Sequence, residues 1–268
     1  MRAGVRRWAL GLEYDGSRFC GWQTQPGGCG VQDALEAALA VIHGGPVKTV
    51  SAGRTDAGVH ASAQVVHFDS LHTRPNSAWV RGVNAHLPRG ISVLWARSVS
   101  GGFDARHSAL ERGYRYLLLN RDVRPALLAG KVGWLHGELD LAAMQQGAAL
   151  LLGTHDFSAF RAAECQARSP IRELRQAMIV RQGCCVVFEF RANAFLHHQV
   201  RNMVGTLVWV GQQRRPPEWV GELLASRDRT RGAATFAADG LYLTEVKYAP
   251  GWGLPTGGGI MPVLPLTL

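Results

Sequence analysis

A short polar loop is the part of the sequence best suited to chemistry. Arg54, Thr55 and Asp56 lie between Gly53 and Gly58 in the run S-A-G-R-T-D-A-G-V-H, with extended segments on both sides. Glycine lets a loop turn tightly and lets another backbone approach closely, so this spacing predicts that the three polar side chains are presented at a strand end. An aspartate presented in this way offers a carboxylate for nucleophilic catalysis. The alternative is a turn in which the arginine and the aspartate form a local ion pair, which is common and weak at a surface.

The elements that must position this loop follow from the hydrophobic periodicity of the first half of the chain. Alternating or short apolar runs predict strands at 8–14, 48–53, 63–68 and 91–99. Apolar residues at helical spacing predict helices at 31–42 and 76–87. The loop with Asp56 therefore connects the second and third strands in the order strand, helix, strand, strand, helix, strand.

The second half of the chain repeats this order. We expect strands near 114–118, 171–181, 184–192 and 241–246, helices at 140–151 and 195–211, and an extra helix opened by Pro216 and Pro217. Two such series predict an α+β fold with two tandem ferredoxin-like (βαββαβ) halves, whose antiparallel sheets join around a central cleft. The predicted halves are 1–105, with the catalytic aspartate loop, and 106–250, followed by a Gly/Pro-rich tail at 251–268.

The charge balance favours a polyanionic partner. The 268 residues include 29 basic and 20 acidic side chains, for a formal net charge of +9. Much of the basic charge is arginine, which suits phosphate and base stacking better than lysine does. Apolar residues make up 47% of the chain, yet none of its runs reaches the roughly 18 apolar residues that would span a bilayer. We expect a cytoplasmic protein without a membrane association.

The five cysteines predict reduced thiols. Their number is odd and no C-x-x-C pair occurs, which argues against a disulfide framework and against a cysteine-rich zinc site.

The run A-G-R-T-D-A-G-V-H-A resembles the signature of the tRNA pseudouridine synthase A family. Further stretches resemble other parts of that family in the same order along nearly the whole chain. They lie at 13–23, 84–88, 103–109, 114–116, 156–161, 195–205 and 240–243. Each stretch is a modest signal, and their order and spacing together are specific.

The resemblance implies an isomerase that converts uridine to pseudouridine at positions 38, 39 and 40 in the anticodon stem and loop of tRNA. The reaction breaks a C–N glycosidic bond, turns the uracil and rejoins it through carbon. It needs no redox step and no energy source, so no cofactor is implied. The resemblance also implies a homodimer in which one tRNA contacts both subunits, with the predicted cleft as the RNA-binding site.

Four residues match the family's active site. Asp56 is implied as the catalytic carboxylate, either attacking the anomeric carbon or acting as a base toward a glycal. Tyr114 is implied to stack on the uracil and to help move the C5 proton. Arg201 is implied to pair with the carboxylate and keep it ionised, and Leu241 to form the apolar wall of the base pocket. Their structural alternatives are a core tyrosine, a solvated helix arginine and a core leucine.

The remaining implied contacts are with RNA. Arg54 resembles a residue that enters the base stack when the target base leaves it. Arg74 can assist from a neighbouring loop, although a loop arginine is usually only solvated. Two segments match RNA-contact regions, namely Phe103, Asp104, Ala105, Arg106 and His107, and Glu164, Cys165, Gln166, Ala167 and Arg168. Their arginines suit phosphate contacts, which position RNA without reading its sequence.

Adjacent histidines are one pattern that can indicate a metal site. His197 and His198 fall in a predicted helix, where neighbouring side chains point about 100° apart and share a metal poorly. We therefore predict no metal.

Two other functions stay open at this point. A non-catalytic RNA-binding protein could keep the fold, and an N-glycosidase could cleave the base without rejoining it.

Overall fold

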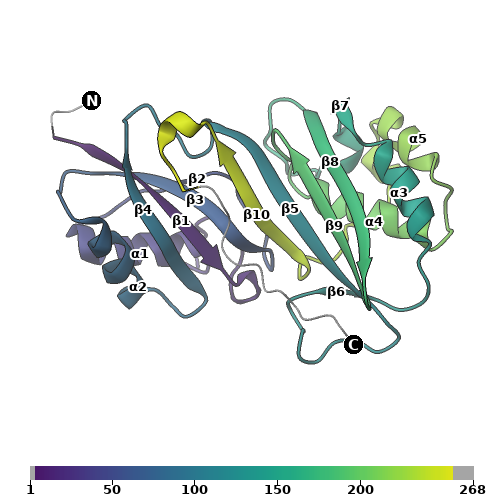
Figure 1. Ribbon diagram of the computed structural model, residues 1–268, viewed down its shortest axis with the longest axis horizontal. Coiled ribbons are helices and arrows are strands. Elements are labelled where there is room, and N and C mark those ends of the chain that lie inside the picture. The colour runs from purple at the N-terminus through teal and green to yellow at the C-terminus, as the bar shows by residue number, and fades with distance from the viewer. Residues whose placement is uncertain (1–3, 256–268) are drawn as a thin grey trace. The chain divides into compact units, whose positions relative to one another are not determined.

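The computed structural model describes residues 4–255. Contacts between Cα atoms group them into two units (Figure 1). Unit 1 holds the described residues through Glu111 together with those from Tyr242 onward, and unit 2 is Arg112–Leu241. The predicted halves, 1–105 and 106–250, differ from these units chiefly at the last strand, which pairs in parallel with a strand of unit 1. Residues 256–268 of the predicted tail lie outside the described residues.

Unit 1 is built on mostly antiparallel strands. Their order is β4 (Ile91–Val99), β1 (Arg6–Tyr14), β3 (His60–Ser70) and β10 (Leu241–Tyr248), and β2 (Val50–Ser51) also pairs with β3. The strand β1 is central because it pairs antiparallel with both neighbours, so that Leu10 lies opposite Val66 on one side and Ala96 on the other. The strand is also buried, with Ala9, Leu10 and Leu12 inaccessible to solvent and Trp8 only 3% accessible.

Two helical segments cover unit 1. The helix α1 (Val31–His43) buries Val31, Leu35 and Leu39, which recur every four residues and so share one face. It ends at Gly44, whose φ of 81° is the left-handed conformation typical of a helix C-terminus. A single π-helical turn, η2 (Ala78–Gly82), leads into the short α2 (Val83–His86), which packs against α1. The predicted helix at 76–87 is therefore present, but its first turn is widened.

Unit 2 has a second, mostly antiparallel set of strands. Their order is β5 (Ala109–Asn120), β9 (Cys185–Ala192), β8 (Ile171–Gln182) and β7 (Gly153–Asp156), and β6 (Gly133–Leu135) pairs in parallel with β5. The helices are α3 (Leu141–Ala149), α4 (Gln199–Gly211) and α5 (Trp219–Ser226), and α3 packs against both α4 and β8. The sequence did not predict β6 and β7, because three or four residues carry too little alternation.

Five short helical turns complete the described chain. They are η1 (Gly16–Arg18), the π-turn η2, η3 (Ser158–Phe160), η4 (Arg229–Arg231) and η5 (Pro250–Trp252). The prediction of an α+β fold with mostly antiparallel strands is confirmed. The tandem ferredoxin-like arrangement stays a prediction.

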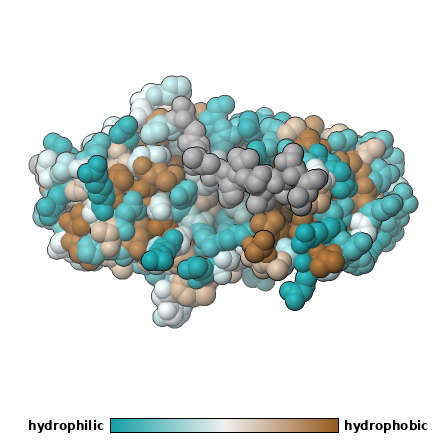
Figure 2. Space-filling view, turned by 60° about the horizontal axis from the view of Figure 1, so that its bottom comes forward, coloured by the Kyte–Doolittle hydropathy of each residue, from teal (hydrophilic) through white to brown (hydrophobic). Residues whose placement is uncertain are grey.

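The surface of the described residues is mixed in character. Figure 2 shows hydrophilic side chains around small hydrophobic patches on the face that it presents. Among the helices of residues 4–255, none is long and apolar enough to cross a membrane.

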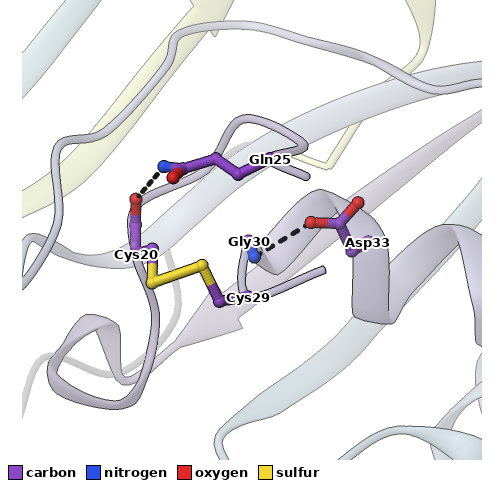
Figure 3. The surroundings of a disulfide bond; sticks show 5 residues. All are labelled: Cys20, Gln25, Cys29, Gly30 and Asp33. Atoms are coloured by element: carbon purple, nitrogen blue, oxygen red, sulfur yellow. Dashed lines mark hydrogen bonds between the residues drawn. A yellow bond between two sulfur atoms is a disulfide. The ribbon is translucent and has the colours of Figure 1, made fainter. Parts of the chain in front are cut away.

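The expectation that all cysteines are free thiols is wrong for one pair. Cys20 and Cys29 form a disulfide bond, with their Cα atoms 5.4 Å apart (Figure 3). The chain turns back between them, since the Gly28 N–H donates to the Gln25 carbonyl oxygen and the Cys20 N–H to that of Cys29, at 2.9 and 3.0 Å. The number of cysteines in the chain gives no information about the local turn between residues 20 and 29. This turn brings the two sulfur atoms together.

We expect the disulfide to stabilise unit 1 by restricting its unfolded chain. The loop it closes spans a sequence separation of 9 residues, for which loop-closure entropy predicts about 2–3 kcal/mol. The double variant Cys20→Ser/Cys29→Ser should show a lower urea midpoint than the wild type. Dithiothreitol should lower the wild-type midpoint to that of the variant and leave the variant unchanged. The single variant Cys184→Ser, at a free thiol, is the control. A wild-type midpoint that does not respond to reductant would contradict the bond.

Candidate active site

The loop between β2 and β3 presents its side chains in alternating directions. Arg54 is exposed, Thr55 is buried with 6% of its surface accessible, Asp56 is half-buried and Ala57 is exposed. Arg54 and, in part, Asp56 are therefore accessible, whereas the prediction that all three polar side chains are presented is wrong for Thr55. Thr55 points inward between them and connects the loop to the core of unit 1.

Backbone hydrogen bonds fix this loop on both sides of Asp56. The Ala52 N–H donates to the Val65 carbonyl oxygen at 2.8 Å, and the Val59 N–H donates to that of Asp56 at 3.1 Å. A third bond, 2.9 Å long, runs from the Trp22 N–H to the Thr55 carbonyl oxygen and joins the loop to the segment after η1.

Gly21 makes that last contact possible. Its φ is +95°, and a Cβ atom at this position would lie 2.9 Å from the Thr55 carbonyl oxygen and 3.0 Å from the Ala57 nitrogen. Only glycine accepts both the conformation and the space. The backbone at Gly21 is therefore in direct contact with the backbone on both sides of Asp56.

Buried polar side chains hold Thr55 from the other side. The Tyr14 hydroxyl is hydrogen-bonded to Thr55 Oγ1 at 2.8 Å. Gln64 Nε2 donates to the Tyr14 hydroxyl oxygen at 3.3 Å and to the Gly53 carbonyl oxygen at 2.7 Å. Burial raises the pKa of Tyr14 to about 12, although the hydrogen bonds from its two partners oppose this shift, so the hydroxyl stays protonated at neutral pH.

The predicted RNA-contact segment at 103–107 divides into inward and outward residues. Phe103 and Ala105 are fully buried, and Phe103 packs in a cluster with Tyr248 and Trp252. Arg106 and His107 are exposed. In this segment, then, side chains available to an RNA come from Arg106 and His107.

Asp104 shapes the turn that presents these two residues. Its Oδ1 accepts hydrogen bonds from the backbone N–H groups of Arg106 and His107, both at 2.8 Å. Partial burial acts to raise the pKa of Asp104, but the two N–H groups outweigh it and the net shift is downward. The Asp104 carboxylate therefore stabilises the backbone of its own turn.

Two residues that the sequence analysis did not single out anchor this segment. Arg7 donates to the carbonyl oxygens of Gly101 and Phe103 at 3.0 and 2.8 Å while it forms a two-pronged ion pair with Asp69. The ring of His67 accepts a hydrogen bond at Nδ1 from the Ala105 N–H at 3.0 Å. Burial, followed by the positive charge of Arg7, lowers the pKa of His67 below its ordinary value of 6.5. At neutral pH the ring is uncharged and can accept this bond.

In unit 2, Tyr114 lies on β5 with 9% of its surface accessible. Its ring meets the ring of Phe195 edge-on, with centroids 5.1 Å apart. Tyr116, two residues along the same strand, is fully buried and donates its hydroxyl to the Ala237 carbonyl oxygen at 3.0 Å. Burial strongly raises the pKa of Tyr116, so this tyrosine is a neutral core residue.

Arg201 and Leu241 are held by the segment before β10. Arg201, on α4, is half-buried and donates through Nε to the Phe236 carbonyl oxygen at 2.8 Å. Leu241 is buried, and its neighbour Gly240 accepts a hydrogen bond from the Leu117 N–H at 2.8 Å. A Cβ atom on Gly240 would lie 2.4 Å from the Leu117 carbonyl oxygen, so this approach to β5 requires glycine.

The second predicted RNA-contact segment, 164–168, shows a similar division. Glu164, Gln166 and Arg168 are exposed, Ala167 is half-buried and Cys165 is buried. The Cys165 carbonyl oxygen accepts a hydrogen bond from Arg161 Nη2. Burial acts to raise the pKa of the Cys165 thiol, but the N–H groups of Ala167 and His197 and the charge of Arg161 lower it overall.

The predicted site residues are thus distributed over both units. Unit 1 carries Arg54, Asp56, Arg74 and the segment 103–107, and Arg74 is exposed. Unit 2 carries Tyr114, Arg201, Leu241 and the segment 164–168.

The prediction that His197 and His198 lie in a helix is wrong. They precede α4, which begins at Gln199, and the backbone of His198 is left-handed with a φ of 61°. Their ring centroids lie only 4.0 Å apart, so the two side chains do not diverge as neighbours on a helix would.

Comparison with known proteins gives the family. The family model described as tRNA pseudouridine synthase matches residues 12–107 and 148–249. The chain belongs to this family. Relatives named tRNA pseudouridine synthase A include proteins of Thiobacillus denitrificans (60% identical), Methylobacillus flagellatus (57%) and Dechloromonas aromatica (57%). The first alignment covers 94% of this chain and 96% of the relative, and the other two cover 93% and 95%.

The predicted family and its class of enzyme, an isomerase, are thereby confirmed. A solved structure described as "Crystal Structure of a Cbf5-Nop10-Gar1 Complex" aligns with 88% of this chain and 48% of its own, at 13% identity and a TM-score of 0.37. A likeness of this size carries no argument.

We expect acid to weaken the anchor at His67. The unfolded histidine takes up a proton near pH 6.5 and the folded one only at lower pH, so its contribution to stability is complete above pH 6.5 and is lost as the pH falls through the folded pKa. The variant His67→Gln has no titrating group there. Its deficit in Tm relative to the wild type should shrink between pH 7.5 and pH 5, as followed by thermal melts.

The exposed His136 supplies the control for this measurement. The variant His136→Gln is measured at the same pH values, and the deficit of His67→Gln should change with pH by more than that of His136→Gln. A deficit for His67→Gln that is constant with pH would contradict the assignment.

Proposed function

We propose that this protein isomerises uridine to pseudouridine at positions 38, 39 and 40 in the anticodon stem and loop of tRNA, with Asp56 as the nucleophile. Membership of the tRNA pseudouridine synthase family supports the reaction and the substrate. The observation that carries the choice of Asp56 is its setting. The residue is half-buried in a loop whose backbone is hydrogen-bonded on both sides of it.

The chemistry follows from a carboxylate held in this way. Asp56 attacks C1′ of the target nucleotide, and the bond from C1′ to N1 of uracil breaks with its electrons leaving on the base. The uracil turns, and its C5 then attacks C1′ and displaces the carboxylate. Loss of the C5 proton and protonation of N1 complete the isomerisation, so no redox partner is consumed and Asp56 is regenerated.

The residues of unit 2 take the supporting roles in this proposal. Tyr114, with its ring fixed edge-on to Phe195, stacks on the uracil and accepts or relays the C5 proton. Arg201 keeps the carboxylate of Asp56 ionised. Leu241 forms the apolar wall beside the base.

The exposed basic side chains are the proposed contacts to tRNA. Arg54 fills the gap left by the extruded base, and Arg74 assists it. Arg106, His107 and Arg168, all exposed, contact phosphates. The protein acts as a homodimer, one tRNA touches both subunits, and the reaction takes place in the cytoplasm.

Site-resolved mapping of pseudouridine tests the reaction and its carboxylate together. Unmodified tRNA incubated with the wild type should gain pseudouridine in the anticodon arm, and Asp56→Asn should reduce the rate by at least about 10⁴-fold because an amide cannot replace the nucleophile. The variant Asp122→Asn, which changes an exposed aspartate of unit 2, is the matched control and should keep full activity.

The same reactions separate the alternative functions. Free uracil with no pseudouridine would identify an N-glycosidase. Tight binding of tRNA without any turnover by a folded wild type would identify a non-catalytic RNA-binding protein. Full activity in Asp56→Asn would refute the role of that carboxylate.

Phosphate contacts should make tRNA binding depend on salt. Each contact releases counterions, so the logarithm of the affinity should fall linearly with the logarithm of the salt concentration. The variant Arg106→Gln should bind more weakly and reduce the magnitude of the slope by about one. Binding titrations of unmodified tRNA at several salt concentrations measure both. The control is Arg124→Gln, at an exposed arginine outside the predicted contacts, and an equal change of slope in both variants would refute a specific contact at Arg106.

A further inference from the structure

We infer that Tyr14 and Gln64 are positioning residues for the catalytic loop and that they act on Asp56 through the hydroxyl of Thr55. The inference rests on the proposed role of Asp56 as the nucleophile. The three side chains form one buried chain of hydrogen bonds that runs from β3 through the end of β1 to the residue immediately before Asp56.

The chain is continuous and closed to solvent. Gln64 is fully buried, Tyr14 has 4% of its surface accessible and Thr55 6%. The pairing of β1 with β3 is irregular between Leu12 and Tyr14, and such irregularities re-aim side chains at the end of a strand. Tyr14 also packs against the ring of Trp22, with centroids 5.9 Å apart, which fixes the direction of its hydroxyl.

The donor and acceptor atoms of Gln64 fix one end of this series of hydrogen bonds. The amide of Gln64 is oriented by its two ends, because Oε1 accepts from the Val65 N–H and Nε2 reaches the Gly53 carbonyl oxygen. Nε2 is a donor only, so the Tyr14 oxygen accepts from it. Either hydroxyl can be the donor between Tyr14 and Thr55, so the bond joins Thr55 Oγ1 to a tyrosine oxygen that Gln64 already holds.

Stability alone does not require this series of buried hydrogen bonds. A buried hydrogen-bonded pair contributes little net free energy, and apolar groups of the same shape can replace both partners at almost no cost. The hydrogen bonds from Gln64 to Gly53 and between Tyr14 and Thr55 fix the residues on both sides of Arg54. Since Thr55 precedes Asp56 directly, the same bonds restrict the path of the nucleophile's backbone.

Positioning of this kind should appear in the rate of the chemical step. A displacement of about 1 Å can cost about 100-fold in rate. We therefore expect Thr55→Val and Tyr14→Phe each to lower the single-turnover rate constant for pseudouridine formation by about 10-fold to 100-fold. The dissociation constant for unmodified tRNA should stay within about 3-fold of the wild-type value, because both variants keep the bond between Gln64 and Gly53.

Another buried threonine of unit 1, Thr49, offers a closely matched control. Thr49 is also a threonine with 6% of its surface accessible, and its hydroxyl donates to Glu36 Oε1 at 3.0 Å, away from the Asp56 loop. The variant Thr49→Val therefore removes the same group from the same depth of unit 1. It should lower the Tm about as much as Thr55→Val and leave the rate constant unchanged.

Two further variants test the mechanism of the effect. Thr55→Ser keeps the hydroxyl and should restore the rate to within about 3-fold of the wild type. The double variant Tyr14→Phe/Thr55→Val removes the same hydrogen bond twice, so it should be no slower than the slower single variant. If Thr55→Val fails to fold, Tyr14→Phe keeps the ring packing and decides the question.

The outcomes separate this inference from the proposed function. An inactive wild type, or an active Asp56→Asn, refutes the proposed function itself. With wild type active and Asp56→Asn inactive, wild-type rates in Thr55→Val and Tyr14→Phe overturn the positioning role alone. An equal loss of rate in Thr49→Val also overturns it, because the effect would then reflect general destabilisation of unit 1.

Discussion

The backbone of the Asp56 loop lies in close contact with the backbone of Gly21 and Trp22. The Trp22 N–H donates a hydrogen bond to the Thr55 carbonyl oxygen at 2.9 Å. A loop this near the core must satisfy its own polar groups, since a buried unpaired carbonyl costs about as much free energy as a lost hydrogen bond. Gly21 allows the approach because a side chain there would meet Thr55 and Ala57. The disulfide between Cys20 and Cys29 begins one residue before this glycine and restricts the segment that forms the contact.

Unit 1 buries polar side chains at positions where they support loops. Gln64 and His67 both lie on β3, most of whose residues are buried. Gln64 bonds to the Asp56 loop and His67 to the segment 103–107. The strand β3 thus anchors two of the unit 1 segments that carry proposed functional side chains, the Asp56 loop and the segment 103–107. A purely apolar strand could fill the same core but could not hold loop backbones through directed hydrogen bonds.

The sequence predicted the elements of this region better than it predicted their fine contacts. The strand at β1 and the helix at α1 follow from periodicity because their apolar residues repeat over nine and thirteen residues. The loop with Asp56 could be found because its residue types are unusual together. Tyr14 fits the end of an alternating strand and a stretch that resembles the family, and neither pattern indicates what its hydroxyl contacts. Gln64 has a recognisable signal in the sequence, because it is a glutamine inside the mostly apolar run A-Q-V-V-H-F. The pairing of Cys20 with Cys29 depends on a local turn that parity does not report.

Three segments with proposed functions share one design, in which buried residues alternate with exposed ones. Thr55 is held inward between exposed Arg54 and half-buried Asp56. Phe103 and Ala105 are buried while Arg106 and His107 face solvent, and Cys165 is buried between exposed Glu164 and Gln166. A charged side chain on a free loop would lose much of its conformational entropy on meeting RNA. Anchoring the residue next to it reduces that loss before binding, and the long arginine side chain keeps enough freedom to adapt to a phosphate. The inward residues of these segments are therefore part of the proposed functional site, even though their side chains are buried.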